Sequence, residues 1–113
     1  MPNYLFTYHQ PKGYVPGSNA ETMSAWQTYF AGIADHVVDP GQPVFERTAL
    51  GKVGDATQLG GYSVVTADDL ESALALAKGS PTLANGGGVE VGTLAELPVD
   101  HIVSQLRERA GRS

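Results

Sequence analysis

The feature that most constrains the fold is the order in which strand-like and helix-like segments follow one another along this 113-residue chain. Aromatic and β-branched residues predict strands at 4–9 and 61–66, a weaker strand at 44–50 and a last one at 89–94. Apolar residues spaced three and four apart predict a helix between the first two strands and another between the last two. The resulting β-α-β-β-α-β order is that of the split βαβ, or ferredoxin-like, α+β fold.

The first predicted helix has signals at both of its ends. Ser18 followed by Glu21 is a capping-box pattern, and Asn19 is an alternative cap. The sequence Asp-Pro-Gly at 39–41 is expected to end the helix, because proline disfavours α geometry in the residue before it and glycine accepts a left-handed turn. The expected apolar face of this helix consists of Met23, Trp26, Phe30, Ile33 and Val37.

The second predicted helix is bounded in the same way. Thr66 and Asp69 form the ends of a capping-box pattern, and Gly79 marks the stop. Glycine-containing loops are expected at 51–58 and 85–88, and a short further helix is expected after residue 98. The expected apolar face of the second helix consists of Leu70, Ala73, Leu74 and Ala77.

Apolar or aromatic side chains occupy both faces of the predicted strands. In the first strand Tyr4, Phe6 and Tyr8 alternate with Leu5 on the other face, and the strand at 61–66 is similar. Because both helices of a ferredoxin-like fold pack on one face of the sheet, the second face needs a cover. We expect a second copy of the chain to supply it, which gives a homodimer of two facing sheets. The alternative is that the C-terminal helix folds back over that face as a lid.

Composition excludes several classes of function. The chain has no cysteine, which rules out disulfides, thiolate metal sites and cysteine nucleophiles. A net charge of −5 and thinly spread Lys and Arg argue against binding to nucleic acid. The chain starts without a signal-peptide pattern and lacks an apolar run of about 20 residues, so we expect a cytoplasmic protein that does not bind membranes. The three histidines have no metal-ligand spacing, and we expect neither a metal nor another cofactor.

Several phrases of the sequence, taken in order, resemble the YCII-related domain family and its DGPF-type relatives. The match covers roughly residues 3–97, and it implies a dimeric α/β barrel built from ferredoxin-like protomers with a cleft of largely uncharacterised role. We therefore expect a YCII-like domain at 1–97 and a C-terminal helix or tail at 98–113. The phrases that carry the resemblance are YLFTYH at 4–9, MSAW at 23–26, VDPGQP at 38–43, LGGY at 59–62, AKGSP at 77–81 and GVEV at 88–91.

The chain departs from this family in two respects. The DGPF tetrapeptide is absent, and GDAT at 54–57 stands about where it would be. Some YCII members look like enzymes that use a His-Asp pair, with the histidine near the start of the first helix. That region reads NAETM at 19–23 and contains no histidine, so this catalytic pair is not carried over.

His9 is the residue best suited to acid–base chemistry, because an imidazole titrates near neutral pH and His9 ends a central strand. Asp39 or Glu90 is the carboxylate that could orient it. The alternative is that His9 makes one structural hydrogen bond to a loop. His36, three residues before Asp39, is expected at the end of the first helix, where the helix dipole stabilises a cationic imidazole.

Three further residues are candidates for ligand binding. Trp26 is either a core side chain or a wall of the cleft, and Tyr62 could present a hydroxyl to it. Glu90 on the last strand is expected either to face solvent or to pair with His9 or Arg47, since an unpaired buried carboxylate is costly. The sequence thus predicts a small-molecule-binding protein with a cleft at the sheet face, and it leaves open whether this protein is an enzyme of unassigned activity. The alternative is a non-catalytic dimerisation or interaction module.

Overall fold

The computed structural model describes residues 1–15, 19–96 and 99–111. Its sheet contains β1 (Asn3–Gln10), β2 (Val37–Asp39), β3 (Gln58–Thr66) and β4 (Gly88–Thr93) in the order β2-β3-β1-β4, and all neighbouring pairs are antiparallel. Helix α1 (Ala20–Gly32) connects β1 to β2, and α2 (Leu70–Ala77) with the short α3 (Pro81–Ala84) connects β3 to β4. The fold thus combines an antiparallel four-stranded sheet with helices, and its elements follow one another in the predicted β-α-β-β-α-β order, with residues 37–39 as the second strand.

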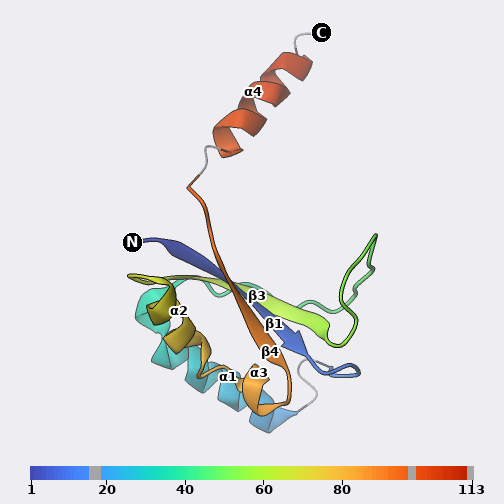
Figure 1. The fold of residues 1–113 in the computed structure, drawn as a ribbon, viewed down its shortest axis with the longest axis vertical. Helices are drawn as coiled ribbons and strands as arrows, with labels where there is room; N and C mark the ends of the chain where they lie inside the picture. Colours follow the sequence, from blue (N-terminus) through green and yellow to red (C-terminus); the bar gives the residue numbers. More distant parts are fainter. Residues whose placement is uncertain (16–18, 97–98, 112–113) are drawn as a thin grey trace.

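The helices α1, α2 and α3 lie on one face of the sheet (Figure 1). Alternate side chains of β1 point towards them, so that Tyr4, Phe6 and Tyr8 are buried while their neighbours are only half-buried. The core is therefore a single layer between sheet and helices. Its buried apolar members are Tyr4, Phe6, Tyr8, Tyr29, Ile33, Val65, Ala67, Ala73 and Ala77.

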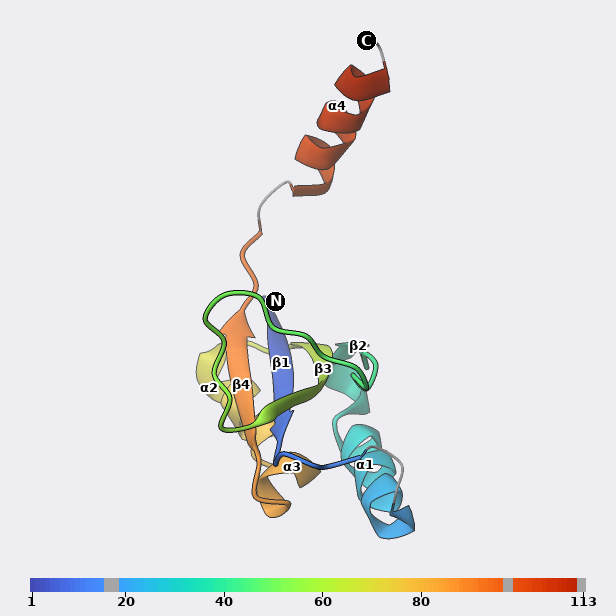
Figure 2. The ribbon, with the colours of Figure 1, turned by 90° about the vertical axis from the view of Figure 1, so that its right-hand side faces the viewer.

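None of the helices in the described residues lies on the opposite face of the sheet. In this face Leu5 lies opposite Val64, and Thr7 lies opposite Tyr62 and Glu90. Helix α4 (Val99–Gly111) extends away from the sheet beyond the end of β4 (Figures 1 and 2). The alternative cover, a C-terminal helix folded back over this face as a lid, is thus not found in this structure.

The first helix is shorter than predicted. It ends at Gly32 and is followed by a 3₁₀ turn, η1 (Ala34–His36), so Val37 belongs to β2 and not to the helix. Glycine is a weak helix former, and the β-branched Val37 is instead paired with Val65 of β3. Asn19 is the cap, since its Oδ1 accepts from the amides of Glu21 and Thr22, while Ser18 lies outside the described residues. The side chain that α1 buries is Tyr29, which the predicted apolar face omitted.

The prediction of a strand at 44–50 is wrong. Residues 44–57 form a loop that projects from the body (Figure 1), and Pro43 makes only an isolated bridge to Gly61. Pro40 and Pro43 lack the amide hydrogen that a strand next to β3 would have to donate. The edge position is therefore taken by the valines of β2, upstream of the prolines.

The second helix begins at Leu70, later than a cap at Thr66 predicts, and its cap differs. Thr66 belongs to β3, and the Asp69 carboxylate itself caps the helix by accepting from the Ser72 amide at 2.8 Å. Ala73 and Ala77 are buried, whereas Leu70 and Leu74 are exposed at the rim of the predicted face. The helix α3 was not predicted, although Ser80 followed by Pro81 is a cap and first-turn pattern. The helix predicted after residue 98 is present as α4.

Candidate functional site

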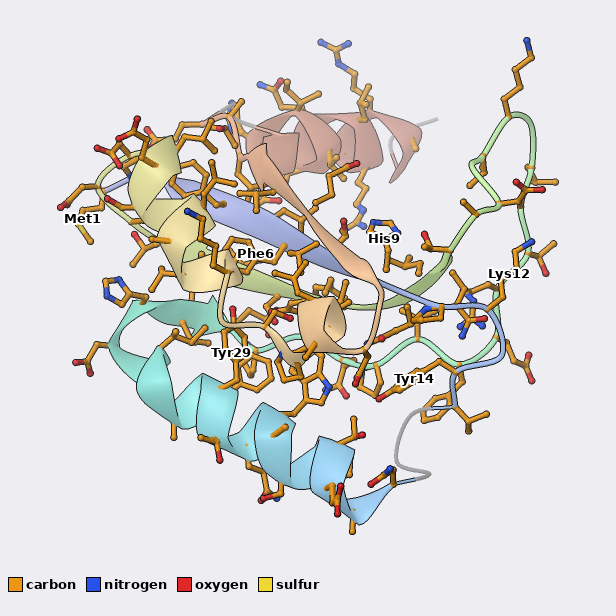
Figure 3. The ribbon with its side chains drawn as sticks, turned by 60° about the horizontal axis from the view of Figure 1, so that its bottom comes forward. Met1, Phe6, His9, Lys12, Tyr14 and Tyr29 are labelled. Carbon is orange, nitrogen blue, oxygen red and sulfur yellow. The ribbon has the colours of Figure 1, made fainter. Side chains whose placement is uncertain are left out.

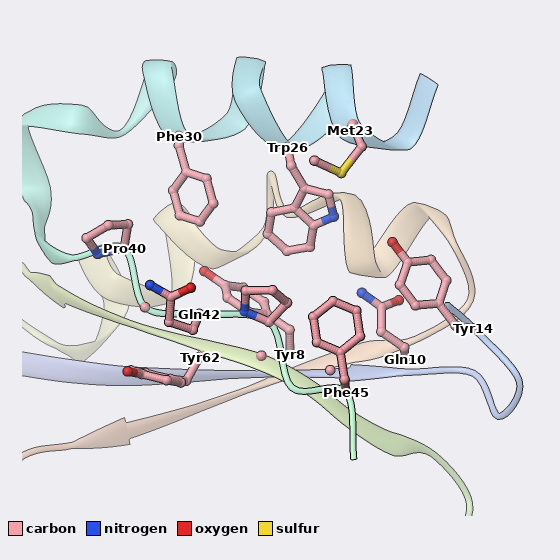
Figure 4. A pocket seen from close by; sticks show the side chains of 14 residues that line it. Tyr8, Gln10, Tyr14, Met23, Trp26, Phe30, Pro40, Gln42, Phe45 and Tyr62 are labelled. Carbon is pink, nitrogen blue, oxygen red and sulfur yellow. The ribbon is translucent and has the colours of Figure 1, made fainter. Parts of the chain in front are cut away.

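A cavity of about 330 Å³ lies between α1, the end of β1, the middle of β3 and the segment 40–45 (Figure 4). It lies within the protomer, on the helix side of the sheet. Its walls are aromatic rings, prolines and glycines. The residues that line it are Tyr8, Gln10, Tyr14, Met23, Trp26, Phe30, Pro40, Gly41, Gln42, Pro43, Phe45, Gly60, Gly61 and Tyr62.

The aromatic wall is built around Trp26. Its ring centroid lies 4.8 Å from that of Tyr8 in an edge-to-face arrangement and 5.6 Å from that of Phe30 in a stacked one. Tyr29 approaches it edge-to-face from the next turn of α1 at 5.9 Å. These contacts favour fixed ring orientations, because aromatic pairs prefer such geometries beyond simple burial. The wall is therefore largely formed before any ligand enters.

Glycines allow the opposite wall to form. Gly41 has φ +74°, and a Cβ at this position would collide with the carbonyl group of Tyr62. A Cβ on Gly61 would lie 3.1 Å from the carbonyl oxygen of Gln42. The segment 40–43 consequently lies directly against β3, and the amide of Val44 donates to the carbonyl of Gly60 at 3.0 Å. The Gly41 amide also donates to the Asp39 carboxylate at 2.8 Å, which forms the tight turn.

Buried hydroxyl groups connect the strands beneath the cavity. The Tyr8 hydroxyl donates to Ser63 Oγ at 3.0 Å, and Ser63 Oγ donates to the Pro40 carbonyl at 2.8 Å. Burial raises the pKa of Tyr8 above its ordinary value, and burial also raises the pKa of Tyr29. Both phenols are therefore neutral over the physiological range. No carboxylate, ammonium, guanidinium or imidazole group is among the described residues that line the cavity.

Two of the predicted site residues, Trp26 and Tyr62, line this cavity. Tyr62 lies opposite Thr7, so its side chain belongs to the open face, and Tyr62 borders the cavity where its backbone closely approaches Gly41. His9 does not line the cavity, because side chains alternate along β1 and that of His9 is on the face opposite to those of Tyr8 and Gln10. Its Nε2 lies 2.9 Å from Thr7 Oγ1. Asp39 is in β2, which β3 separates from β1, so the structure does not bring Asp39 and His9 together.

The structure does bring Glu90 towards His9. Glu90 lies opposite Thr7 on β4, and His9 lies opposite Gly88, so the two side chains are diagonal neighbours on the open face. Glu90 is exposed, as one of its two expected environments requires. No ion pair joins Glu90 to His9 or Arg47 in the part of the chain that the structure describes; Arg47 instead donates to the carbonyls of Val44 and Phe45.

The other histidines have structural partners. His36 ends the 3₁₀ turn, not the first helix as predicted, and its Nδ1 lies 3.1 Å from the carbonyl oxygen of Thr66. His101 Nε2 lies 3.2 Å from Gln105 Nε2 on α4. Within residues 1–15, 19–96 and 99–111, no three acidic or histidine side chains gather in a way that could hold a metal ion. None of the helices in these ranges is long and apolar enough to cross a membrane.

Several residues that line the cavity were not predicted from the sequence. Gln10 closes one end of the cavity and is 2% exposed, although it follows the predicted strand and reads as the first residue of a loop. Tyr14 and Phe45 come from loops, where no periodicity indicates which way a side chain points. A usable signal was present in Gly41, Gly60 and Gly61, since glycines beside strands often mark a close backbone approach.

Comparison with known proteins identifies no family for the chain. No family model matches it, and no curated protein is significantly similar to it. Among solved structures, it is similar to 5-chloro-2-hydroxyhydroquinone dehydrochlorinase from Burkholderia phenoliruptrix, determined in complex with 2,5-dihydroxybenzoquinone. The two chains are 17% identical, the match covers 78% of this chain and 90% of the other, and the TM-score is 0.49. A similarity at this level assigns no activity to the chain.

Proposed function

We propose that this protein binds a small, flat, uncharged molecule in the cavity between α1 and the segment 40–45. The observation that carries the proposal is an aromatic cavity with no charged lining side chain among the described residues. A charged ligand would lose its hydration there without gaining an ionic partner, which is costly. A planar ring would instead stack against the wall formed by Trp26 and Phe30.

The size of the cavity supports a compact ligand. About 330 Å³ is at the lower end of the range for small-molecule sites, which suits a ligand of one or two rings. The site is accessible from solvent on the side of Met23 and Phe45, which are 45% and 62% exposed. The same two side chains could close over a bound ring.

The test uses Trp26, the only tryptophan in the chain, because its indole N–H gives a single resonance in a nitrogen-correlated NMR spectrum. Titration with phenol or indole should shift this resonance in a saturable way. Phe45→Ala should weaken binding several-fold and leave the thermal stability nearly unchanged, since Phe45 is largely exposed. Leu50→Ala is the matched control, because Leu50 is 89% exposed in the same loop and does not line the cavity. Equal affinities for the two variants would refute this placement of the site.

We also propose that the chain is a member of the YCII-related family, with a folding unit at 1–97 and an appended helix at 98–113. The support is that four of the phrases carrying the resemblance contribute to the cavity. They supply Tyr8, Met23 and Trp26, the segment 40–43 and the segment 60–62. A shared cavity would explain why these phrases, far apart in the chain, occur together.

A second proposal, from the uncovered sheet face, is that two copies of the chain pack these faces together. Leu5 and Val64 are only half-buried there, and Leu59 is 37% exposed. Such apolar surface without a covering layer favours association. Light scattering should give a dimer mass for the protein and a monomer mass for Val64→Arg. The control Leu70→Arg changes a similarly apolar but helix-borne residue and should stay dimeric; a monomeric parent protein would refute the proposal.

A catalytic role for His9 stays a prediction. In the arrangement described above, Glu90 is better placed than Asp39 to orient its imidazole, because both side chains belong to the open face of adjacent strands. Such a pair would serve general acid–base chemistry at that face. Loss of ligand binding in His9→Ala would place the ligand site on this face and not in the cavity.

A further inference from the structure

The strongest unexplained feature of the cavity is an unpaired polar atom at its inner end. Gln10 is 2% exposed, yet its side-chain oxygen Oε1 is buried without a hydrogen-bond partner among the described residues. Nearly all buried polar groups in folded proteins are paired, and an unpaired one costs about 1–3 kcal/mol. Gln10 lines the cavity, and its side chain points from β1 towards α1, with the amide oxygen on the side of Tyr14 (Figure 4).

The surroundings of Gln10 hold this amide in one place. Its Nε2 donates to Thr82 Oγ1 at 3.5 Å, and the Ser80 hydroxyl donates to the same oxygen at 3.1 Å. Thr82 and Ser80 are both buried, so solvent does not compete for these hydrogen bonds. On the other side, a Cβ on Gly60 would lie 2.6 Å from Gln10 Cγ, so only glycine leaves room for the side chain.

Gly60 is also the extra residue of a β-bulge. The register between β1 and β3 passes from Tyr8 opposite Gly61 to His9 opposite Leu59 and skips Gly60. Bulges of this kind re-aim neighbouring groups and are frequent beside binding sites. The bulge, the missing Cβ and the buried hydroxyl anchor together orient the Gln10 amide towards the cavity.

We infer that Gln10 Oε1 is the specificity group of the cavity and accepts a hydrogen bond from the ligand. This inference rests on the proposed ligand site and deepens it. The ligand class is an uncharged aromatic ring that carries a hydroxyl or N–H donor, with the ring against Trp26 and the donor at Gln10. A site built to pair with such a donor rejects an analogue that lacks it, because the analogue leaves the buried acceptor unpaired.

The experiment compares three probes of similar size by the shift of the Trp26 indole resonance. Phenol carries a donor, anisole carries only an acceptor, and toluene carries neither. The protein should bind phenol about tenfold more tightly than toluene or anisole, which is the scale expected when one buried hydrogen bond is made or left unmade. In Gln10→Met, a variant of similar shape without the amide, this preference for phenol should disappear while toluene still binds.

The outcomes separate the inference from the proposal beneath it. Equal affinities for phenol and toluene in the unaltered protein, or tighter binding of anisole, would overturn the role of Gln10 and leave the aromatic site standing. A preference for phenol that survives in Gln10→Met would overturn it as well. Failure of all three probes to shift the indole resonance would overturn the ligand site itself and, with it, this inference. The comparison of probes in the unaltered protein remains decisive even where Gln10→Met does not fold.

Discussion

The contact between Gly41 and β3 leads to a quantitative prediction, because a second glycine offers a control with nearly the same backbone conformation. Gly41 has φ +74° and Gly51 has φ +73°. A Cβ added at Gly41 would collide with the backbone carbonyl of Tyr62, whereas one added at Gly51 would meet nothing within 4 Å. The left-handed conformation costs an alanine roughly 1–2 kcal/mol at either position.

The collision adds a second cost at Gly41 alone. The carbonyl of Tyr62 is held in β3 and cannot move aside as a flexible side chain would, so we add about 1–3 kcal/mol for overpacking. Gly41→Ala should therefore lower the free energy of unfolding by about 2–5 kcal/mol, and Gly51→Ala by no more than about 2 kcal/mol. Each kcal/mol corresponds to a fall of about 4 °C in Tm for a domain of this size.

The assay is urea unfolding of the two variants, monitored by circular dichroism. The folded variants are also titrated with phenol, and the shift of the Trp26 indole resonance is measured. Gly41→Ala should also weaken phenol binding, because the segment 40–43 must move away from β3 and widen the cavity. Gly51→Ala should bind phenol as the parent protein does. Equal losses of stability in the two variants would refute the close approach of segment 40–43 to the sheet.

Two individual hydrogen bonds and the position of His9 lead to three further predictions. Tyr29→Phe removes the bond from the hydroxyl to the Leu76 carbonyl, 3.0 Å long, and should cost about 1 kcal/mol in thermal or urea unfolding; an unchanged stability would argue against that bond. The Ser72 amide holds the pKa of Asp69 below its ordinary value, so its contribution to stability is present above the ordinary aspartate pKa and is lost as pH falls through the lowered one. Asp69→Asn, which keeps a cap without the charge, should flatten this acid limb of the stability curve; an identical limb would contradict the assignment. His9→Ala should leave phenol binding unchanged, because His9 lies on the other face of the sheet; loss of binding would move the site to that face.

Much of the fold could be predicted because the hydrophobic periodicity of most elements agrees with the capping and turn residues at their ends. The alternation of Tyr4, Phe6 and Tyr8 with Leu5 predicted the strand, but not which of its two apolar faces the helices cover. The first helix was extended too far because Val37 continues its apolar spacing, and only pairing with Val65 of β3 decides for a strand. Local pattern cannot reveal that contact, since it joins residues far apart in the chain.

The site was only partly predictable for a similar reason. Trp26 and Tyr62 could be named from the sequence because Trp26 lies on the apolar face of the predicted helix and Tyr62 follows two glycines and carries a hydroxyl. The importance of Gln10 depends on the bulge at Gly60 and on the buried hydroxyl of Thr82, which only the folded chain brings together. His9 is a candidate from the sequence because of its imidazole, whereas the described lining residues of the cavity include no imidazole, carboxylate, ammonium or guanidinium group.

The most direct test of the account is a map of backbone amide shifts in the protein as phenol is added. If the ligand binds between α1 and β3, the shifts should concentrate at Gln10, Tyr14 and Trp26 and along the segments 40–45 and 60–62. Saturable shifts centred instead on the open sheet face, at Thr7, His9 and Glu90, would contradict the central claim.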